Sequence, residues 1–300
     1  TRMDAALIFE ELSAACPSTA AFISIHNMAS WMIDSFGDDD QRARFLPKMM
    51  SMNHLASYCL TEPGAGSDAA ALATKAVRDG DDYVLNGSKI WTTLAQWADM
   101  IFCLVRTSKT GKPQEGISFI VFPMTLPGIT IRPLPTLDGP AEGQHEINQV
   151  FFENVRVPIK DALIGEENKG WTYAKYLLEF ERGNAYAPGL RHMLRKARKI
   201  ASKEIAGGEP VIRDPDFARK LAQLEIRIEM LDATERRVLS SLSAGQNVGP
   251  ESSMLKCAGS EAQQAITELA LEAAGLYGAP FVQDTIALLE AGGNETCPTP

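Results

Sequence analysis

The chain has 300 residues, of which 45% are hydrophobic, and its formal net charge is −9 at pH 7. This length and composition exclude a disordered chain and predict a multi-domain enzyme with two or three modest cores. Clustered Lys and Arg are missing, which argues against a nucleic-acid surface. The four histidines and five cysteines are scattered. Because a zinc or iron–sulfur site needs close ligand spacing, we expect no metal.

Residues 1–57 are predicted to form an N-terminal helical domain. Apolar residues recur there at helical spacing, and Pro17 and the acidic turn at 37–41 interrupt the pattern. The sequence opens inside this pattern without an initiator Met and closes on the turn-rich segment GGNETCPTP. We therefore expect the domain at each end to be truncated.

Residues 58–165 carry short apolar or alternating runs, such as MIFCLVR and ISFIVF, separated by Gly and Pro turns. This pattern predicts a middle β domain, antiparallel and barrel-like. From residue 166 to 300 the period is helical again, and it predicts a C-terminal four-helix bundle. The clearest buried stripe is Phe217, Leu221, Leu224, Ile228, Leu231, Val238 and Leu242. The expected fold class is thus α+β, with several domains.

The segment YCLTEPGAGSDAAA (58–71) joins an apolar start to a glycine-rich turn. Gly64 and Gly66 allow the backbone to approach an anion closely, and the hydroxyls of Thr61 and Ser67 can donate to a pyrophosphate or a flavin edge. An ordinary turn between strands is the alternative, because neither a Walker loop nor a GxGxxG pattern is present.

A second segment, NGSKIWTTLAQWAD (86–99), places a predicted Asn-Gly turn at 86–87 ahead of Trp91 and Thr93, with Trp97 following. An aromatic residue followed by hydroxyls suits a flat heteroaromatic ring. Taken alone, Trp91 is also compatible with a position in the core.

These two segments, together and in this order, resemble the acyl-CoA dehydrogenase family. CLTEPGAGSDAAA follows the first signature of that family, and FFENVRVPIKDALIGEENKGWTYAKYLL extends the resemblance over roughly the whole chain. NGSKIWTTLAQWADMIFCLVRT is most similar to the branch that contains the large subunit of pimeloyl-CoA dehydrogenase. STAAFISIHNMASWMIDSFG is also similar to the isobutyryl-CoA branch.

The resemblance implies a bound FAD that lies between the β domain and the helix bundle. Thr61 would bond to the pyrimidine side of the flavin, Thr93 would bond near N5, and Trp91 would pack on the ring. Ser67 would lie near the pyrophosphate and the bound acyl-CoA. The implied cofactor-binding residues are Tyr58, Leu60, Thr61, Gly66, Ser67, Trp91 and Thr93.

The implied reaction is α,β-dehydrogenation of an acyl-CoA thioester to the trans-2-enoyl-CoA, by α-proton abstraction and β-hydride transfer to flavin N5. Some relatives carry the basic Glu in a late segment that this sequence does not reach, and others carry it on the first bundle helix directly before an Arg. Glu181 precedes Arg182, so the resemblance implies Glu181 as the catalytic base. A solvated or ion-paired Glu181 is the alternative. Ser67, Glu179 and Arg182 are the implied substrate contacts.

Two departures from the family pattern concern the adenine half of the cofactor site. The segment 197–217 contains no Arg-x-x-Phe-Gly, and Leu276 replaces a small residue between Gly275 and Gly278. Both departures are compatible with a heteromeric assembly.

The resemblance also implies partners and a location. We expect an acyl-CoA substrate, an electron-transfer flavoprotein as electron acceptor and a homo- or heterotetramer, with no nucleic-acid or membrane partner. No apolar run approaches the roughly 18 residues of a membrane span, so we expect a soluble protein, in the cytoplasm of a bacterium or the mitochondrial matrix of a eukaryote. The alternatives are an acyl-CoA oxidase and a catalytically silent subunit of a heteromeric dehydrogenase.

Overall fold

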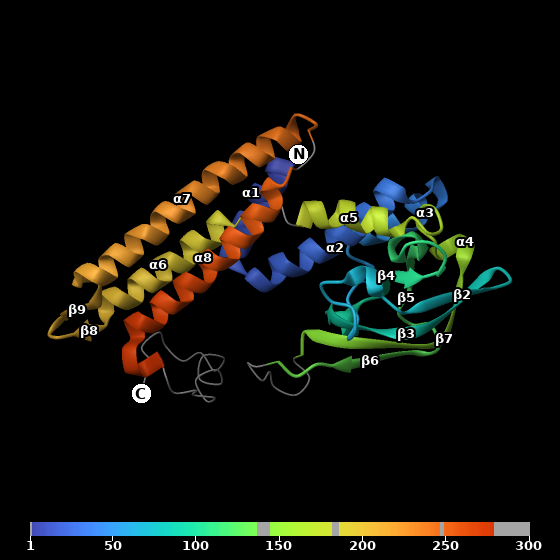
Figure 1. Cartoon of the computed structure of the whole chain (residues 1–300), viewed down its shortest axis with the longest axis horizontal. Helices are drawn as coiled ribbons and strands as arrows, with labels where there is room; N and C mark the ends of the chain where they lie inside the picture. The colour runs from blue at the N-terminus through green and yellow to red at the C-terminus, as the bar shows by residue number, and fades with distance from the viewer. Residues whose placement is uncertain (1, 137–144, 182–185, 247–248, 279–300) are drawn as a thin grey trace. The chain divides into compact units, whose positions relative to one another are not determined.

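The computed structural model describes residues 2–136, 145–181, 186–246 and 249–278 (Figure 1). The chain divides into two compact units, one made of residues 16–179 and the other of residues 1–15 and 180–300. The predicted α+β class is confirmed, because a mixed sheet with helices forms one unit and helices dominate the other.

The helices of the first unit are α2 (Pro17–Phe36), α3 (Asp39–Met50), α4 (Ile159–Ala162) and α5 (Gly170–Glu181), whose last two residues fall in the second unit. Asp38 begins α3 with a capping box. Its carboxylate accepts the Gln41 amide at 2.7 Å, and the Gln41 side chain accepts the Asp38 amide at 3.1 Å. The predicted interruption is confirmed at residues 37–38, between α2 and α3, and residues 39–41 are already the start of α3.

The sheet of this unit has seven strands in the order β1-β4-β2-β3-β7-β6, with β5 paired to β4. The β1–β4 and β2–β4 pairs are parallel and the other pairs are antiparallel. Its strands are β1 (Ala56–Cys59), β2 (Lys75–Asp79), β3 (Asp82–Thr93), β4 (Met100–Arg106), β5 (Ile117–Pro123), β6 (Ile129–Pro133) and β7 (Ile147–Pro158). Short 3-10 helices lie between strands at η1 (Ala69–Ala71), η2 (Ala95–Trp97) and η3 (Pro113–Gly116).

The predicted Asn-Gly turn at 86–87 is wrong, because these residues lie inside β3. The chain reverses instead at Gly80, between β2 and β3, where φ is +63°. Gly87 is needed for a different reason. A Cβ on Gly87 would lie 2.6 to 2.9 Å from atoms of Thr74, so only glycine allows β3 to pass Thr74 this closely.

The two faces of the sheet pack into separate cores. In β4, Ile101 and Cys103 belong to one core, and Phe102 and Leu104 belong to the other, as expected for a strand buried on both sides. Helices α2 and α5 cover the second face (Figure 1), where Met32 packs with the β4 side chains. The sheet is therefore a rigid base for the loops at its edges.

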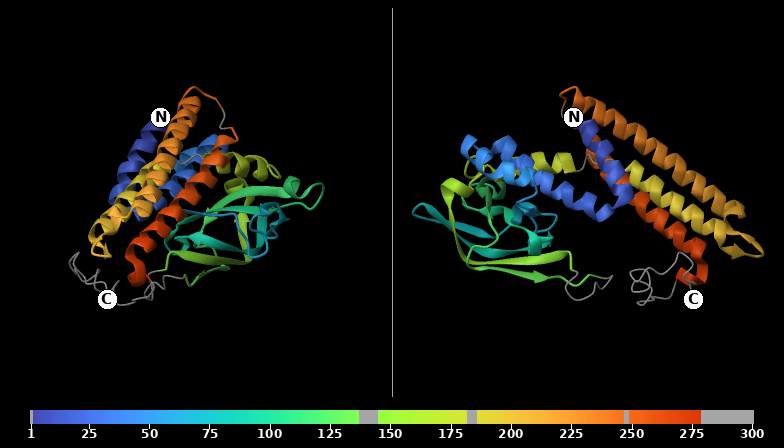
Figure 2. Two further views of the ribbon diagram at one scale, coloured as in Figure 1. Left: turned by 60° about the vertical axis from the view of Figure 1, so that its left-hand side comes forward. Right: turned by 180° about the vertical axis from the view of Figure 1, so that it is seen from behind.

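The second unit contains α1 (Arg2–Ala15), α6 (Ala187–Lys203), α7 (Pro215–Ser243) and α8 (Glu251–Ala274). Figure 2 shows α6, α7 and α8 running side by side. A hairpin of β8 (Ile205–Ala206) and β9 (Glu209–Pro210), then η4 (Val211–Arg213), joins α6 to α7, and η5 (Gly275–Gly278) follows α8. The predicted stripe on α7 is confirmed, with six buried members and a half-buried Leu242, the buried ones being Phe217, Leu221, Leu224, Ile228, Leu231 and Val238. No helix within the described ranges has the length and apolar character needed to cross a membrane.

Candidate functional site

The two segments singled out in the sequence lie side by side. The Ile90 amide of β3 donates to the carbonyl of Thr61 at 3.0 Å, and the Ser57 hydroxyl of β1 donates to the carbonyl of Thr93 at 2.8 Å. Strand β2 pairs with β3 only as far as Asn86. The chain that follows β1 therefore takes the place of β2 along the last part of β3.

A β-bulge directs Trp91 out of the sheet. Between the pairs Lys89–Val150 and Thr92–Asn148, β3 advances three residues while β7 advances two. Trp91 lies in this bulge with φ of +63°, a conformation that a bulky residue rarely adopts and that concentrates at functional sites. Its side chain is 60% exposed. The core position considered for Trp91 is therefore excluded, and its indole face is available to a ligand.

Three of the predicted cofactor residues carry hydroxyl groups. Thr61 and Thr93 are half-buried and Ser67 is exposed. In the described part of the chain, none of these three hydroxyls has a hydrogen-bond partner. Gly66 provides further room, because a Cβ there would have no neighbour within 4 Å. Neither packing within the chain nor a positive φ requires glycine at this position, which suits close approach of a ligand.

Tyr58 and Leu60 lie on the face of the sheet covered by α2 and α5, where both are half-buried. The Tyr58 ring lies 6.4 Å from the ring of Phe119. The structure thus brings Tyr58, Leu60 and Thr61 close to the part of β3 that contains the Trp91 bulge. We call this region, formed by residues 58–61 and 90–93, the Trp91 edge. The loop that follows carries the other two predicted cofactor residues, Gly66 and Ser67.

The sequence interpretation missed a buried ion pair beneath this edge. The Lys89 ammonium lies 2.8 Å from a carboxylate oxygen of Glu62 and donates to the carbonyl of Leu60 at 3.1 Å. The residues Tyr83 and Leu85 of β3 are buried at alternate positions. The same period of two would have placed Lys89 on the inner face.

Opposing effects act on the pKa of Glu62. Burial acts to raise it, but the charge and hydrogen bond of Lys89, together with hydrogen bonds from the Ala73 amide and from Thr74, outweigh burial and hold the pKa below its ordinary value. The carboxylate is therefore ionised at neutral pH and forms a true ion pair with the lysine.

The predicted base and two predicted substrate contacts remain predictions. The structure gives the backbone of α5 as far as Glu181, but the side chains of Glu179 and Glu181 lie outside the described residues, as does the whole of Arg182. In the late glycine segment, Leu276 is 91% exposed within η5.

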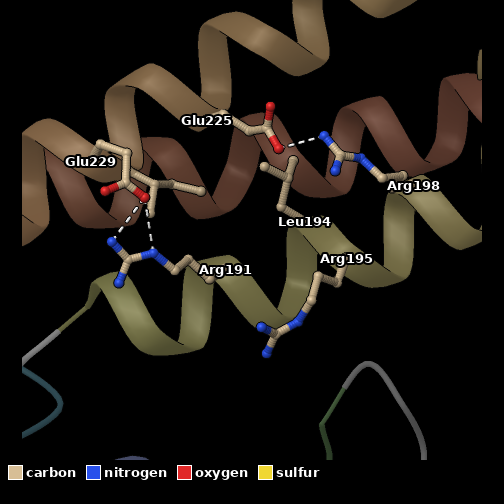
Figure 3. Close-up of a pocket in the computed structure, with 7 residues that line it drawn as sticks. Arg191, Leu194, Arg195, Arg198, Glu225 and Glu229 are labelled. Carbon is tan, nitrogen blue, oxygen red and sulfur yellow. Dashed lines mark hydrogen bonds and ion pairs between the residues drawn. The ribbon is translucent and has the colours of Figure 1, made fainter.

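A groove of about 380 Å³ lies between α6 and α7 (Figure 3). Arg191 forms an ion pair with Glu229 at 2.8 Å, and Arg198 pairs with Glu225. Arg195 points away from both acids (Figure 3). Most charges in the groove are therefore paired within the chain. No group of three or more metal-ligating side chains occurs in the parts of the chain that are described.

The side chains at the Trp91 edge fit the isoalloxazine ring of FAD. An exposed indole offers an aromatic surface, and the hydroxyls of Thr61 and Thr93 are donors without partners in the described chain. Donors near the nitrogen atoms of a flavin stabilise its reduced state. The fold and the residue types at this edge suit a flavin-binding α+β protein.

Three family models match the chain in order. They are the N-terminal domain of acyl-CoA dehydrogenase at residues 1–53, the middle domain at 57–155 and the C-terminal domain at 168–291. The acyl-CoA dehydrogenase FadE26 of Mycobacterium tuberculosis is 34% identical over 277 residues, which cover 90% of this chain and 68% of that protein. The mitochondrial isobutyryl-CoA dehydrogenase of Bos taurus is 35% identical, with 93% and 67% covered.

The crystal structure of an acyl-CoA dehydrogenase from Geobacillus kaustophilus superposes with a TM-score of 0.84 at 30% identity, covering 92% of this chain and 73% of that chain. The chain belongs to the acyl-CoA dehydrogenase family. The family prediction is confirmed, and so is the arrangement of an N-terminal helical, a middle β and a C-terminal helical domain. Members of this family are FAD-containing oxidoreductases that act on CH–CH bonds.

Proposed function

We propose that this protein catalyses FAD-dependent α,β-dehydrogenation of an acyl-CoA thioester to the trans-2-enoyl-CoA. Family membership supports the reaction class and the cofactor. The observation in this chain that carries the proposal is the Trp91 bulge, which lies beside two threonine hydroxyls that have no partner in the described chain.

The residues of the Trp91 edge would hold the flavin. Thr61 and Thr93 would donate hydrogen bonds to the ring, and Trp91 would pack against it. When bound, FAD supplies the oxidising capacity of the reaction by accepting the β-hydrogen with its electron pair. Ser67 would contact the pyrophosphate and the substrate.

The base would remove the α-proton as the double bond forms. We assign this role to Glu181, because a carboxylate directly before Arg182 matches the position of the base in one group of relatives. Glu179 and Arg182 would contact the substrate. A carboxylate base works best when it is held close to its proton and shielded from water.

The family-model matches support domains at 1–57, 58–165 and 166–300. Membership of the pimeloyl-CoA branch is a hypothesis that rests on the sequence similarity of residues 86–107. We place the protein in the cytoplasm of a bacterium or the mitochondrial matrix of a eukaryote.

For the electron acceptor we propose an electron-transfer flavoprotein, and for the assembly a homo- or heterotetramer. Heteromeric assembly is supported by the likeness to the ChsE4–ChsE5 complex of Mycobacterium tuberculosis, with a TM-score of 0.73 at 31% identity over 89% of this chain and 72% of that chain.

The spectrum of the purified full-length protein tests the proposed function. We expect a yellow protein with flavin absorbance that bleaches without oxygen when a panel of straight and branched acyl-CoA thioesters is added. Bleaching must be accompanied by enoyl-CoA formation. Absence of FAD in the wild-type protein, or a flavin that no acyl-CoA reduces, would reject the proposal.

A catalytically silent subunit is the second candidate. The segment where the family carries Arg-x-x-Phe-Gly is here occupied by the β8–β9 hairpin and η4. A silent subunit would copurify with a second chain and would not contain bleachable FAD of its own. Rapid consumption of oxygen during turnover would instead indicate an acyl-CoA oxidase.

A further inference from the structure

Lys89 is a lysine with no exposed surface, located inside β3. Its ammonium group bonds to the Glu62 carboxylate and the Leu60 carbonyl. Removing two charges from water is costly, and a buried ion pair adds little net stability compared with apolar residues of similar size. Stability alone is therefore a weak reason for a lysine at this position.

Glu62 connects the pair to both ends of the glycine-rich loop. Besides Lys89, its carboxylate accepts the amide of Ala73 at 2.6 Å and the amide of Thr74 at 3.0 Å. Its backbone also forms a bridge with Ala65 across the turn. One buried carboxylate thus closes the loop at its base, between the end of β1 and the start of β2.

Thr61 lies between the two residues that Lys89 contacts. The carbonyl of Leu60 precedes Thr61, and the side chain of Glu62 follows it. The carbonyl of Thr61 itself accepts the Ile90 amide. Three successive residues are therefore attached to β3 immediately before the Trp91 bulge, Leu60 and Thr61 through their carbonyls and Glu62 through its side chain.

We propose that Lys89 is a positioning residue for the cofactor site. Together with Glu62, it forms a buried clamp that holds the Thr61 hydroxyl in fixed relation to Trp91 and Thr93. This inference rests on the proposed function. The positive charge of Lys89 and the negative charge of Glu62 cancel. The clamp therefore orders the Trp91 edge without adding net charge beneath it. Ordering a site before its ligand arrives reduces the entropy lost on binding.

The first test separates positioning from folding. Three variants are compared, Lys89→Met, Glu62→Gln and the double variant. The thermal unfolding midpoint is measured together with the FAD dissociation constant, obtained from the fluorescence of FAD released when the holoprotein is diluted. Each single variant leaves a buried charge unpaired and is expected to lower the midpoint.

The double variant contains no unpaired charge, so we expect its midpoint to recover toward that of the wild type. Its FAD dissociation constant should stay raised on the order of tenfold to hundredfold, because the bond to the Leu60 carbonyl is still absent. A double variant that binds FAD as tightly as the wild type would overturn the inference. Arg156→Gln is the matched control, because it removes exposed ion pairs with Asp79 and Asp82 in the same sheet and should leave FAD binding unchanged.

The second test asks whether Lys89 acts through Thr61, and it does not depend on recovery of stability. Thr61→Val is introduced into the wild type and into Lys89→Met. If the clamp positions the Thr61 hydroxyl, Thr61→Val should weaken FAD binding in the wild type and have little further effect in Lys89→Met. Additive effects would overturn the inference. If the wild-type protein itself binds no FAD, the proposed function fails, and this result is distinct from both outcomes.

Discussion

Trp91 and Trp97 are exposed to almost the same extent, at 60% and 59%, but only Trp91 has a left-handed backbone conformation. Trp97 ends the short helix η2 directly after β3. Trp91 lies in the bulge of β3, beside Thr93 and opposite β7. Trp91 and Trp97 are thus a matched pair of exposed aromatic residues. Trp91 belongs to the Trp91 edge, and Trp97 does not.

We expect Trp91→Ala to weaken FAD binding by about tenfold, because an aromatic contact contributes on the order of 1 kcal/mol beyond the area it buries. Trp97→Ala should leave FAD binding within about twofold of the wild type. The measurement is a fluorescence titration of FAD for both variants. Equal losses in the two variants would contradict the assignment of Trp91.

Thr93→Val should raise the FAD dissociation constant by about fivefold to tenfold, because a net hydrogen bond contributes about 1 kcal/mol. The unfolding midpoint should hardly change, since the hydroxyl has no partner in the described chain. Thr130→Val, at an exposed position of β6, is the matched control. An unchanged flavin spectrum and affinity in Thr93→Val would remove Thr93 from the site.

Glu181→Gln is expected to retain FAD and to lose activity by several orders of magnitude, because the amide cannot accept the α-proton. The measurement is the rate of flavin bleaching by acyl-CoA in a single turnover. Glu179→Gln is the control, and it should change the KM for the substrate more than the rate of bleaching. A near-normal rate in Glu181→Gln would show that the base lies elsewhere.

Gly66 and Gly87 should respond differently to alanine. A Cβ at Gly87 would lie within 3 Å of Thr74, so we expect Gly87→Ala to lower the free energy of unfolding by about 1–3 kcal/mol. Gly66→Ala meets no neighbour within the chain and should leave stability near that of the wild type, but it should weaken FAD binding. Urea unfolding and FAD titration of both variants test this contrast.

We expect Glu235 to make the stability of the helical unit depend on pH. Its carboxylate accepts the Tyr186 amide at 2.6 Å and the Ala187 amide at 3.2 Å, at the start of α6. Burial raises the pKa of Glu235, and these hydrogen bonds offset burial only in part. Because the folded state holds this proton more tightly than the unfolded state, stability should fall as the pH rises above the ordinary carboxyl pKa of about 4.3.

Glu235→Gln cannot ionise and should not show this fall. We therefore expect the free energy of unfolding of the wild type, relative to Glu235→Gln, to decrease between pH 4.5 and pH 7. Urea unfolding at several pH values measures the difference. A difference that is constant with pH would contradict the raised pKa.

Much of the fold follows from the local pattern of the sequence. The steps of three and four between Phe217, Leu221 and Leu224 are sufficient to place one face of α7 in a core. An apolar run such as MIFCLVR, in a region of Gly and Pro turns, is sufficient to predict a strand. The first feature depends on the helical period and the second on a continuous apolar run, and both are properties of neighbouring residues. The family signature likewise identified the segments around Thr61 and Trp91.

Only the tertiary structure decided how those segments meet. The Trp91 bulge exists because β3 carries one residue more than its partner β7, and Gly87 is required by the passage of Thr74 beside it. The partners of Lys89 at Leu60 and Glu62 are 29 and 27 residues away in the chain. The sequence by itself determined which faces of the elements are apolar and which family signatures are present. Register, bulges and buried ion pairs depend on contacts between residues distant in the chain, and no local period encodes them.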